Sequence, residues 1–455
     1  MGRILDLNRL DTVLQQAPAV AVSGRVVKVT GLVVEVVLPD ISVGATCEIE
    51  VGSAQGGRAS VMAECVGFHG ERALLVPAGE VRGIKNGAVV TPLARAAEIR
   101  VGPELLGRVV DARMAPIDGG PPLALPHKAP LAQPPPPPML RRRIARAFAT
   151  GVRVIDGLLT CGEGQRVAIM AGAGVGKSVL LGMLARHCEA DVIVVGLIGE
   201  RGREVREFIE RDLGPRGRPR AVVVVATGDT PPLERVHAAN AATAIAEHFR
   251  AQGKKVLLLM DSLTRVAMAL REIGLSADEP PTSKGYPPSV FAALPKLLER
   301  AGNDEGEGSI TAMYTVLVEG DDLADPVADC ARAALDGHVV LSRKLAGGGH
   351  FPAVDVLQSV SRVALEVTAA PQQKLARDTR DALSALAESS DLVDVGAYVA
   401  GSNPRVDHAL AVKGALHAFL RQEPDEKSAL RATLESLQKA LSVPAAAPRR
   451  EVPRA

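Results

Sequence analysis

Aromatic residues are scarce in this chain, which has seven Phe, three Tyr and no Trp among 455 residues. Proteins that bind single-stranded nucleic acid usually stack the bases on aromatic rings, so a platform of that kind is not expected. The formal net charge of +1 also argues against a strongly basic binding surface. We therefore expect no nucleic-acid partner.

Cysteines and long apolar runs are scarce as well. The five cysteines are scattered without a C-x-x-C pair, which predicts small buried residues in a reducing compartment and no disulfide frame or zinc site. No apolar run approaches the ~18 residues that a membrane span needs. The N-terminus has no basic-then-apolar signal segment. These absences predict a cytoplasmic protein whose membrane role, if any, is peripheral.

The first third of the chain changes pattern twice. Residues 1–20 are expected to form an N-terminal arm, in which residues 4–16 are amphipathic. This segment is either a short helix docked on its own domain or an arm that binds a partner or a membrane surface. Residues 21–98 alternate β-branched and polar residues between glycine turns, which predicts a small β-barrel.

A connector is expected over residues 99–148, where turn residues are frequent. Its proline run at 133–138 must be extended, because proline lacks the N–H that a helix interior requires. The basic triplet Arg141, Arg142 and Arg143 is interpreted as a solvated face in preference to a binding patch.

The rest of the chain divides into an α/β part and a helical part. Residues 149–368 alternate apolar runs with helical stretches, which predicts buried parallel strands and an α/β nucleotide-binding domain. Residues 369–441 show helical patterns without clear strands and predict a small all-helical domain. A disordered tail is expected over residues 442–455.

The segment 166–178, RVAIMAGAGVGKS, has the pattern of a phosphate-binding loop between a strand and a helix. Glycines allow backbone N–H groups to surround an anion, and the helix N-terminus adds further N–H groups. Ala171 stands where the motif usually begins with glycine, which is tolerable if its φ is negative. The residues expected to bind the nucleotide are Gly172, Ala173, Gly174, Val175, Gly176, Lys177, Ser178 and Val179.

Within this loop, Lys177 is expected to contact the β- and γ-phosphates, and Ser178 to ligate Mg²⁺. Asp261 ends the apolar run VLLLM, at the tip of a neighbouring strand, where a carboxylate can hold Mg²⁺. The alternative role for Asp261 is a helix N-cap. Glu200 follows another buried run on a glycine turn and could polarise the attacking water, although a solvated charge cluster is the alternative.

Hydrolysis also needs positive charge for the transition state, and in ring ATPases an arginine of the next subunit often supplies it. Arg362 ends the segment FPAVDVLQSVSR, just before the helical part of the chain. Spacing alone leaves Arg343 open as a second candidate.

Taken together, these motifs resemble one family, the type III secretion ATPases. This group comprises injectisome and flagellar export ATPases and is related to the catalytic subunits of rotary ATP synthases. The resemblance extends over residues 20–440, with two departures, at Ala171 and in the linker ARMAP (112–116), which commonly reads A-x-G-x-P. Its segments are GRVVKVTGLVVEV, TGVRVIDGLLTCGEGQR, AGAGVGKS, GERGREV, LLLMDSLTR, DEPPTSKGYPPSVFAALPKLLERAG, LDGHVVLSRKLA and FPAVDVLQSVSR.

The resemblance implies roles for individual residues. Glu200 matches the catalytic glutamate, and Arg362 matches the arginine finger supplied across the ring. Phe351 matches the aromatic residue that stacks on adenine, and Tyr398 is expected to close the other face of the base. The implied fold is an N-terminal β-barrel, a RecA-like α/β core and a C-terminal helical domain. The implied ligands are ATP and Mg²⁺.

The same resemblance implies partners. It predicts a homohexamer with a coiled-coil stalk protein in its channel and a stator-like regulator on the N-terminal arm. It also predicts chaperone–substrate complexes at the helical domain and a peripheral position at an inner-membrane export gate. We expect an ATPase that releases chaperones from export substrates and unfolds them, in an injectisome.

The flagellar counterpart is the alternative machine, since the segment VGAYVAGSNPRVDHAL suits both, whereas TCGEGQR and PPPPPMLRRR favour the injectisome. A rotary synthase subunit is less favoured, because its acidic helical loop is not visible around 370–398. A non-catalytic ring subunit is disfavoured by Glu200, and an RNA translocase by the near-zero charge.

Overall fold

The computed structural model describes residues 22–442, apart from residues 53–57 and positions 319, 321 and 323. The predicted arm and tail therefore lie outside the described residues, except for Ser442. Contacts group the chain into two compact units. One holds the chain up to Ala97 together with Leu275–Glu279, and the other holds Glu98–Gly274 and the chain from Pro280 onward. Each unit is described by itself.

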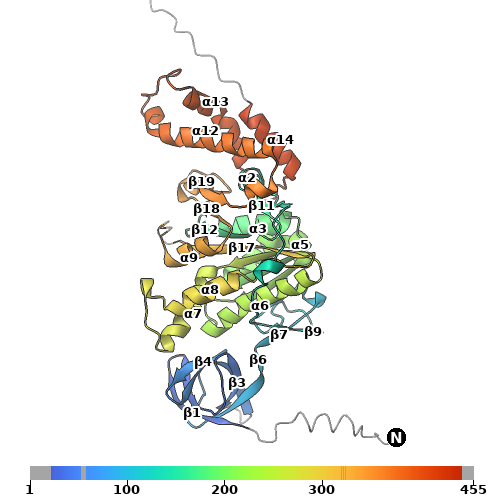
Figure 1. Cartoon of the computed structure of the whole chain (residues 1–455), viewed down its shortest axis with the longest axis vertical. Helices are drawn as coiled ribbons and strands as arrows, with labels where there is room; N and C mark the ends of the chain where they lie inside the picture. Colours follow the sequence, from blue (N-terminus) through green and yellow to red (C-terminus); the bar gives the residue numbers. More distant parts are fainter. Residues whose placement is uncertain (1–21, 53–57, 319, 321, 323, 443–455) are drawn as a thin grey trace, which may run out of the picture. The chain divides into compact units, whose positions relative to one another are not determined.

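The first unit contains the predicted β-barrel, drawn in blue in Figure 1. Its antiparallel strands close in the order β1-β2-β5-β4-β3-β6. Alternate side chains point inward and form an apolar core that includes Val34, Cys47, Ile49 and Leu75, each completely buried. The strand bounds are β1 Gly24–Thr30, β2 Val33–Val37, β3 Ala45–Gly52, β4 Arg58–His69, β5 Arg72–Pro77 and β6 Val89–Ala96.

The second unit is built on a nine-stranded sheet, counted over the described residues, with the order β19-β18-β12-β17-β15-β13-β14-β8 and with β16 beside β17. The apolar runs predicted as buried parallel strands form six parallel strands of this sheet. They are β12 Arg166–Ala171, β13 Val192–Ile198, β14 Ala221–Ala226, β15 Lys255–Asp261, β17 Ser309–Leu317 and β18 Gly337–Leu341. The edge strand β19 (Val354–Ser361) is antiparallel to β18.

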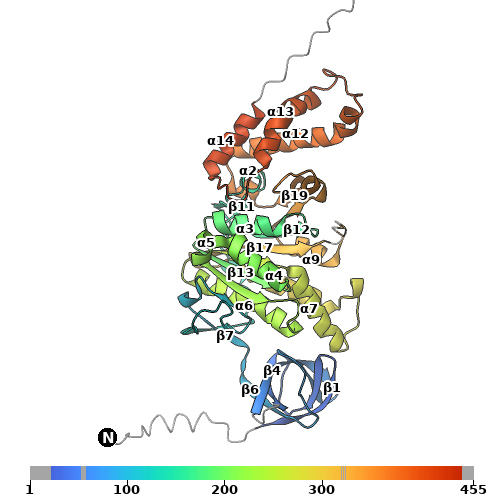
Figure 2. The same ribbon diagram turned by 180° about the vertical axis from the view of Figure 1, so that it is seen from behind.

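Helices cover both faces of this sheet, as the opposite views in Figures 1 and 2 show. The α/β core predicted from the alternating pattern is therefore confirmed. The helices of this layer are α3 Lys177–His187, α4 Gly202–Glu207, the π-helical turn Phe208–Leu213, α5 Gly214–Gly217, α6 Pro232–Ala251, α7 Leu263–Ser276, α8 Pro288–Leu298, α9 Pro326–Ala334, α10 Arg343–Gly347 and α11 Ala364–Val367. Short pieces are β10 Ala147–Phe148, β11 Cys161–Gly162 and β16 Gly302–Asn303, with 3-10 turns at Arg218–Arg220 and Ser283–Gly285.

The connector has more regular structure than its turn-rich sequence predicts. β8 (Val109–Val110) extends the central sheet beside β14, and β7 (Glu98–Val101) pairs with β9 (His127–Pro130). A 3-10 turn covers Pro103–Leu105. The proline run is extended as expected up to Pro137, but Pro138 begins a second 3-10 turn, Pro138–Leu140. Proline is tolerated there because the first helical residue needs no N–H partner.

In the linker ARMAP, Met114 stands where the common pattern A-x-G-x-P has glycine. Its φ is 66°, in the left-handed region that favours glycine. The side chain is nevertheless buried, with 5% of its surface exposed. Apolar burial therefore offsets part of the cost of an unfavourable backbone conformation.

The expectation of a solvated basic face is wrong for Arg141. Its guanidinium donates to the carbonyl of Ala301 at 3.0 Å, to the carbonyl of Glu299 and to the Glu299 carboxylate at 3.2 Å. Arg142 also donates to the carbonyl of Gly308, at 2.9 Å. Arg141 and Arg142 therefore tie the connector to the α/β core, and the proline run brings them there.

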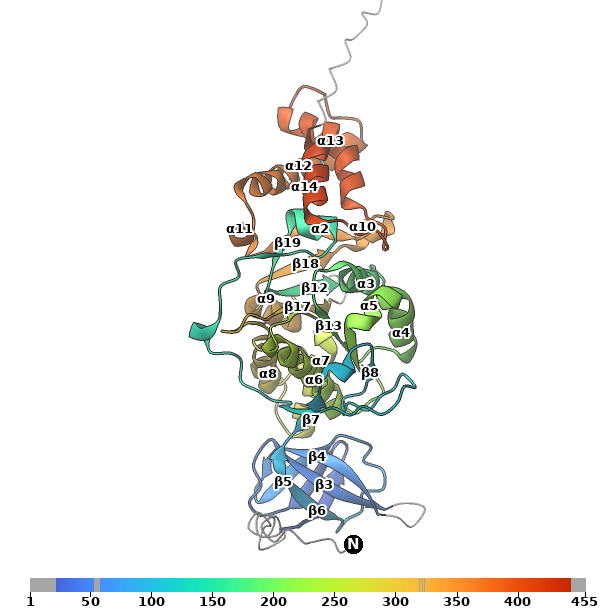
Figure 3. The same cartoon turned by 90° about the vertical axis from the view of Figure 1, so that its right-hand side faces the viewer.

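The C-terminal part is helical, as predicted, and packs on the α/β core through α2 (Arg153–Leu158). Its helices are α12 Ala370–Asp394, α13 Pro404–Leu420 and α14 Leu430–Leu441, gathered beside α2 in Figure 3. Gly157 allows this close approach, because a Cβ there would lie 3.2 Å from the Phe419 ring and 3.6 Å from Leu437.

The structure can be compared with two expectations from the sequence, on the pairing of cysteines and on membrane-spanning helices. The cysteines form no disulfide: Cys47, Cys65, Cys161 and Cys188 are buried free thiols and Cys330 is half-buried. In the described part of the chain, no helix combines the length and apolar character needed to cross a bilayer.

Candidate functional site

The phosphate-binding loop lies between the end of β12 and the start of α3. Gly174 and Gly176 have φ angles of 77° and 90°, which only glycine adopts without strain. Ala171 is the last residue of β12 and has no positive φ, so the departure from the motif is accommodated. No side chain caps α3, so its first N–H groups are available to an anion.

The parallel sheet gathers the phosphate loop, Asp261 and Glu200 at the carboxyl ends of its strands. In the strand order β12-β17-β15-β13, the loop follows β12, Asp261 ends β15, and Glu200 follows β13. Carboxyl ends of parallel strands lie at the same edge of a sheet, where ligands of open α/β sheets bind. Sequence distances of 23 and 84 residues thereby become direct contacts.

Lys177 links both predicted carboxylates. Its ammonium lies 2.6 Å from Asp261 Oδ1 and 3.2 Å from Glu200 Oε1. The three side chains are 13%, 5% and 14% exposed, respectively, so water screens these charges weakly. One ammonium between two carboxylates leaves the cluster with one net negative charge.

The pKa values in this cluster follow from burial and from the opposing charges. Burial acts to lower the pKa of Lys177, but Asp261 and Glu200 outweigh burial and hold the pKa above its usual 10.5. Burial raises the pKa of Asp261, Lys177 acts to lower it, and Glu200 acts to raise it. Lys177 is therefore held as a cation, and its charge opposes the rise that burial imposes on the pKa of Asp261.

Thr315 is a member of this site that the sequence did not single out. Its hydroxyl, on β17, donates to Asp261 Oδ1 at 2.6 Å. The register of β15 and β17 places Met260 opposite Tyr314, so Asp261 lies beside Thr315. Only the knowledge that these two strands are neighbours could have identified it.

Glu200 is held by the turn that follows β13. Gly199 has a φ of 74°, and its N–H donates to the carbonyl of Ala226 at 2.6 Å. A Cβ on Gly199 would lie 2.7 Å from the side chain of Arg265. Glycine at this position therefore lets the chain turn so that the Glu200 carboxylate reaches Lys177.

The two aromatic residues implied by the resemblance lie in different surroundings. Phe351 is 43% exposed, and a Cβ on Gly176 would lie 3.3 Å from its ring, so the ring lies against the phosphate loop. Tyr398 lies between α12 and α13, with its hydroxyl 3.0 Å from Asp407 Oδ1 and 3.1 Å from the carbonyl of Asn403. The adenine contacts of both residues stay predictions.

The two candidate arginines lie at opposite ends of the parallel strands: Arg343 near their carboxyl ends and Arg362 near their amino ends. Arg343 donates to the carbonyl of Ala173 in the phosphate loop at 3.2 Å. Arg362 is exposed and follows β19, whose last residue, Ser361, lies opposite Gly337 at the start of β18. The register of β12 and β18 places Gly337 level with Val167, which precedes Gly172 by five residues. That is roughly 16 Å along a strand. Arg362 therefore cannot reach the phosphate loop of its own chain.

Ser178 and Asp261 suit Mg²⁺ in the chemistry of their donor atoms. A hydroxyl and a carboxylate are the oxygen ligands that this hard cation prefers. Ser178 is the second residue of α3, directly after Lys177, and Asp261 contacts Lys177. At Gly174 an added Cβ would meet nothing within 4 Å, so the loop borders open space. Their roles as metal ligands stay predictions.

Family models match three successive parts of the chain. Residues 26–94 match the β-barrel domain of the ATP synthase alpha/beta family. Residues 151–361 match the nucleotide-binding domain of the same family. Residues 368–439 match the C-terminal domain of the T3SS EscN ATPase.

Relatives under two names are equally similar to this chain. A flagellum-specific ATP synthase of Salmonella typhimurium is 50% identical over 439 residues, covering 95% of this chain and 96% of the relative. A type 3 secretion system ATPase of Sinorhizobium fredii is 50% identical over 407 residues, covering 90% and 89%.

Solved structures agree with this likeness. The assembled ATPase EscN of the enteropathogenic E. coli type III secretion system matches with a TM-score of 0.87 and 42% identity, covering 92% of this chain and 100% of that chain. EscN in complex with its central stalk EscO matches with a TM-score of 0.83 and 41% identity, at the same coverage.

Proposed function

Because the chain belongs to the family of type 3 secretion system ATPases and flagellum-specific ATP synthases and is an ATP hydrolase, we propose that it energises type III protein secretion, with an injectisome as the favoured machine. It works as a homohexamer that hydrolyses Mg²⁺-ATP, releases chaperones from export substrates and unfolds those substrates. The observation that carries the chemistry is the Lys177 ammonium held between Asp261 and Glu200 beside the phosphate loop.

Lys177 links nucleotide binding to activation of Glu200. The ammonium lies between the two carboxylates. When phosphate oxygens enter the loop, the ammonium turns to them, and the Glu200 carboxylate is left free to accept a hydrogen bond from water. Glu200 then orients the attacking water and takes its proton. Ser178 and Asp261 would hold Mg²⁺, which would supply positive charge to balance that of the phosphates.

Thr315 donates to Asp261 Oδ1 at 2.6 Å and opposes the rise in the pKa of Asp261 when Lys177 turns to the phosphates. A hydrogen bond to the charged form of a carboxyl favours that form. Phe351 stacks on the adenine beside the loop, and Tyr398 closes the other face. The specificity for ATP resides in these aromatic contacts.

The site is incomplete in one copy of the chain. Arg362 is exposed at the edge of the sheet opposite the phosphate loop, so it serves a neighbouring copy. A head-to-tail interface of this kind closes into a ring. The related ATPase EscN has been solved as an assembly, which supports a ring for this chain. Arg362 neutralises charge that develops on the γ-phosphoryl group of the neighbour's ATP.

The proposed partners follow the family. A coiled-coil stalk protein occupies the channel of the ring, as the complex of EscN with its central stalk EscO suggests. Residues 1–20 bind a stator-like regulator and keep the ring at the cytoplasmic face of the inner-membrane export gate. Chaperone–substrate complexes dock on the helices α12 to α14.

The decisive experiment is a clean deletion in the source organism, scored for swimming and for the secreted-protein profile. Complementation with the intact gene should restore the phenotype, and complementation with Lys177→Ala should not. Loss of secreted effectors with intact swimming supports the injectisome. Loss of swimming identifies the alternative, the flagellar export ATPase, which equal identity to both groups of relatives keeps open. Loss of neither contradicts a role in protein export.

A further inference from the structure

We propose that Gln165 is a positioning residue for Arg362 and thereby for hydrolysis at the neighbouring subunit. This inference rests on the proposed role of Arg362 as the arginine supplied across the ring. Gln165 lies directly before β12, at the edge of the sheet away from the phosphate loop. Its contacts reach the backbone on which Arg362 is mounted.

Arg362 makes one backbone and one side-chain hydrogen bond to other segments of the chain. Its N–H donates to the carbonyl of Asp336 at 3.0 Å. Its guanidinium is exposed and donates to the carbonyl of Arg332 at 3.0 Å. The direction in which the side chain leaves the surface therefore depends on where Asp336 and the end of β19 are held.

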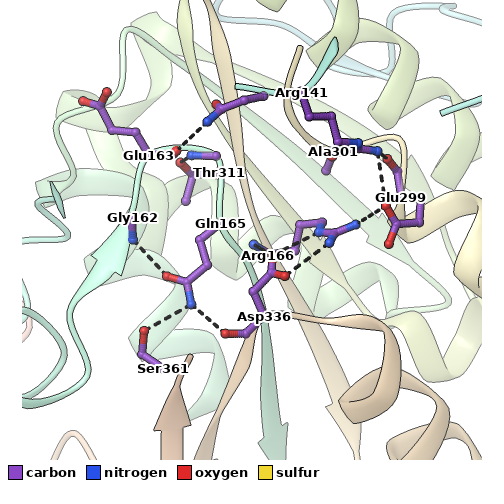
Figure 4. Close-up of polar contacts among 12 residues, drawn as sticks. Arg141, Gly162, Glu163, Gln165, Arg166, Glu299, Ala301, Thr311, Asp336 and Ser361 are labelled. Carbon is purple, nitrogen blue, oxygen red and sulfur yellow. Dashed lines mark hydrogen bonds and ion pairs between the residues drawn. The ribbon is translucent and has the colours of Figure 1, made fainter. Parts of the chain in front are cut away.

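Gln165 holds both of these segments. Its side-chain amide is completely buried and donates to the carbonyl of Asp336 at 2.9 Å and to the hydroxyl of Ser361 at 3.2 Å. The carbonyl of Asp336 thus accepts from Gln165 and from Arg362 at once. Figure 4 shows the amide between Gly162, Asp336 and Ser361.

The remaining atoms of the amide and of Ser361 are also engaged. The Gln165 side-chain oxygen accepts from the N–H of Gly162 at 2.9 Å, which fixes the orientation of the amide. The Ser361 hydroxyl donates to the carbonyl of Thr160 at 2.8 Å. A fully connected buried network of this kind holds one geometry, because each lost bond leaves a buried polar atom without a partner.

Arg166, the residue after Gln165, holds the carboxylate of Asp336. The Arg166 Nε and Nη2 atoms donate to the Asp336 carboxylate at 3.1 and 3.2 Å (Figure 4). Gln165 and Arg166 together therefore fix the backbone and side chain of Asp336. The same strand, β12, carries the phosphate loop at its other end, so one rigid element holds both the subunit's own nucleotide loop and the arginine offered to its neighbour.

This geometry predicts a defect in turnover without a defect in nucleotide binding. Gln165→Met keeps the length of the side chain but removes every hydrogen bond of the amide. A misplacement of a catalytic group by about 1 Å can cost about 100-fold in rate, so we expect kcat to fall roughly 10- to 100-fold. The KM for ATP should stay close to the wild-type value, because the loop that binds ATP lies at the opposite edge of the sheet.

A matched control separates this role from simple damage to the fold. Thr311→Val, at the same edge, removes the acceptor of the Gly164 N–H at 3.0 Å but touches neither Asp336 nor Ser361. It should keep kcat near wild type while lowering the melting temperature about as much as Gln165→Met. Ser361→Ala, a milder change of the same network, should reproduce a smaller fall in kcat.

The sharpest test mixes two impaired variants. Lys177→Ala disables its own site but keeps a well-placed Arg362, whereas Gln165→Met keeps its own site intact. In a ring assembled from equal amounts of both, about a quarter of the interfaces join an intact site to an intact arginine, and activity should recover accordingly. No recovery, or a Gln165→Met variant with wild-type kcat, would overturn the inference.

The Arg362→Ala variant keeps this outcome separate from the proposed function. If Arg362→Ala itself retains wild-type kcat, the shared-site proposal fails and the Gln165 inference fails with it. If Arg362→Ala is inactive but Gln165→Met is not, only the inference fails. In the Arg362→Ala background, adding Gln165→Met should lower kcat no further, because both changes remove the same contribution.

Discussion

Replacing Lys177 with methionine should destabilise the nucleotide-free protein, and the loss should depend on pH. The ammonium lies 2.6 and 3.2 Å from two carboxylates, in surroundings from which water is largely excluded. Methionine keeps most of the volume of the side chain but leaves Asp261 and Glu200 together without a counter-charge.

The distances set the size of the effect. At an effective dielectric constant of about 20, the pair at 2.6 Å attracts by about 6 kcal/mol and the pair at 3.2 Å by about 5 kcal/mol. Desolvation of the three charged groups offsets much of this attraction. Removing one partner of a buried pair costs about 3–5 kcal/mol, and we expect a loss of that order at neutral pH.

The sign of the pH dependence follows from the pKa of Asp261. Burial already raises this pKa above its ordinary 3.8, and loss of the lowering effect of Lys177 raises it further. A carboxyl whose pKa is higher in the folded state binds its proton on folding, so the variant recovers stability as the pH falls toward that pKa. Lys177 of the wild type stays protonated throughout, because its pKa is raised from 10.5.

The assay is urea unfolding of the nucleotide-free protein at about pH 8 and about pH 5, with the variant compared to wild type at each pH. Lys255→Met is the control, since Lys255 is 42% exposed and its ion pair with Glu163 should contribute at most about 1 kcal/mol. A loss for Lys177→Met that is equal at both pH values, or no larger than that of the control, would refute the reasoning.

Four further predictions concern catalysis, assembly and stability. Glu200→Gln should keep ATP binding and abolish turnover, and near-normal phosphate release would remove Glu200 as the catalytic group. Arg362→Ala should lower kcat by about 1,000-fold or more with nucleotide affinity near wild type, whereas loss of binding alone would point to Arg343. Specific activity should rise with protein concentration as rings assemble, and a concentration-independent rate from a proven monomer would contradict the shared site. Glu247→Gln should cost about 3–5 kcal/mol of folding free energy, because Arg300, 2% exposed, donates to that carboxylate at 2.9 and 2.7 Å; an unchanged unfolding midpoint would show that the amide substitutes fully.

Features that depend only on residues close in the sequence could be predicted from sequence patterns. The glycine loop, Lys177 and Ser178 form one continuous segment, so their placement follows from the strand, turn and helix that the residues encode. The six buried strands were predictable because a strand covered on both faces is apolar at every position. The antiparallel edge strand β19 has a mixed pattern, and nothing in its residues gives its direction.

One prediction failed, and one residue of the site was missed, because both depended on distant parts of the chain. The triplet beginning at Arg141 has the composition of a solvated face, yet the extended prolines bring Arg141 to carbonyl groups at the end of α8. Thr315 carries no local signal of function, since a threonine in a buried strand is ordinary. It joins the site because β17 lies beside β15.

The sequence by itself determined the α/β core, the phosphate-binding loop and the strand-end position of Asp261, because strand periodicity, glycine turns and residue chemistry are properties of short segments. These properties left two interpretations of Glu200 open and did not separate Arg362 from Arg343; the resemblance to the family made those choices. The tertiary structure alone decided how these residues meet. The order of the parallel strands brought Lys177 into contact with two carboxylates from remote segments. The antiparallel return of β19 carried Arg362 to the opposite edge of the sheet, beyond reach of its own loop. Strand order and direction are set by packing over the whole sheet, and no single segment contains them.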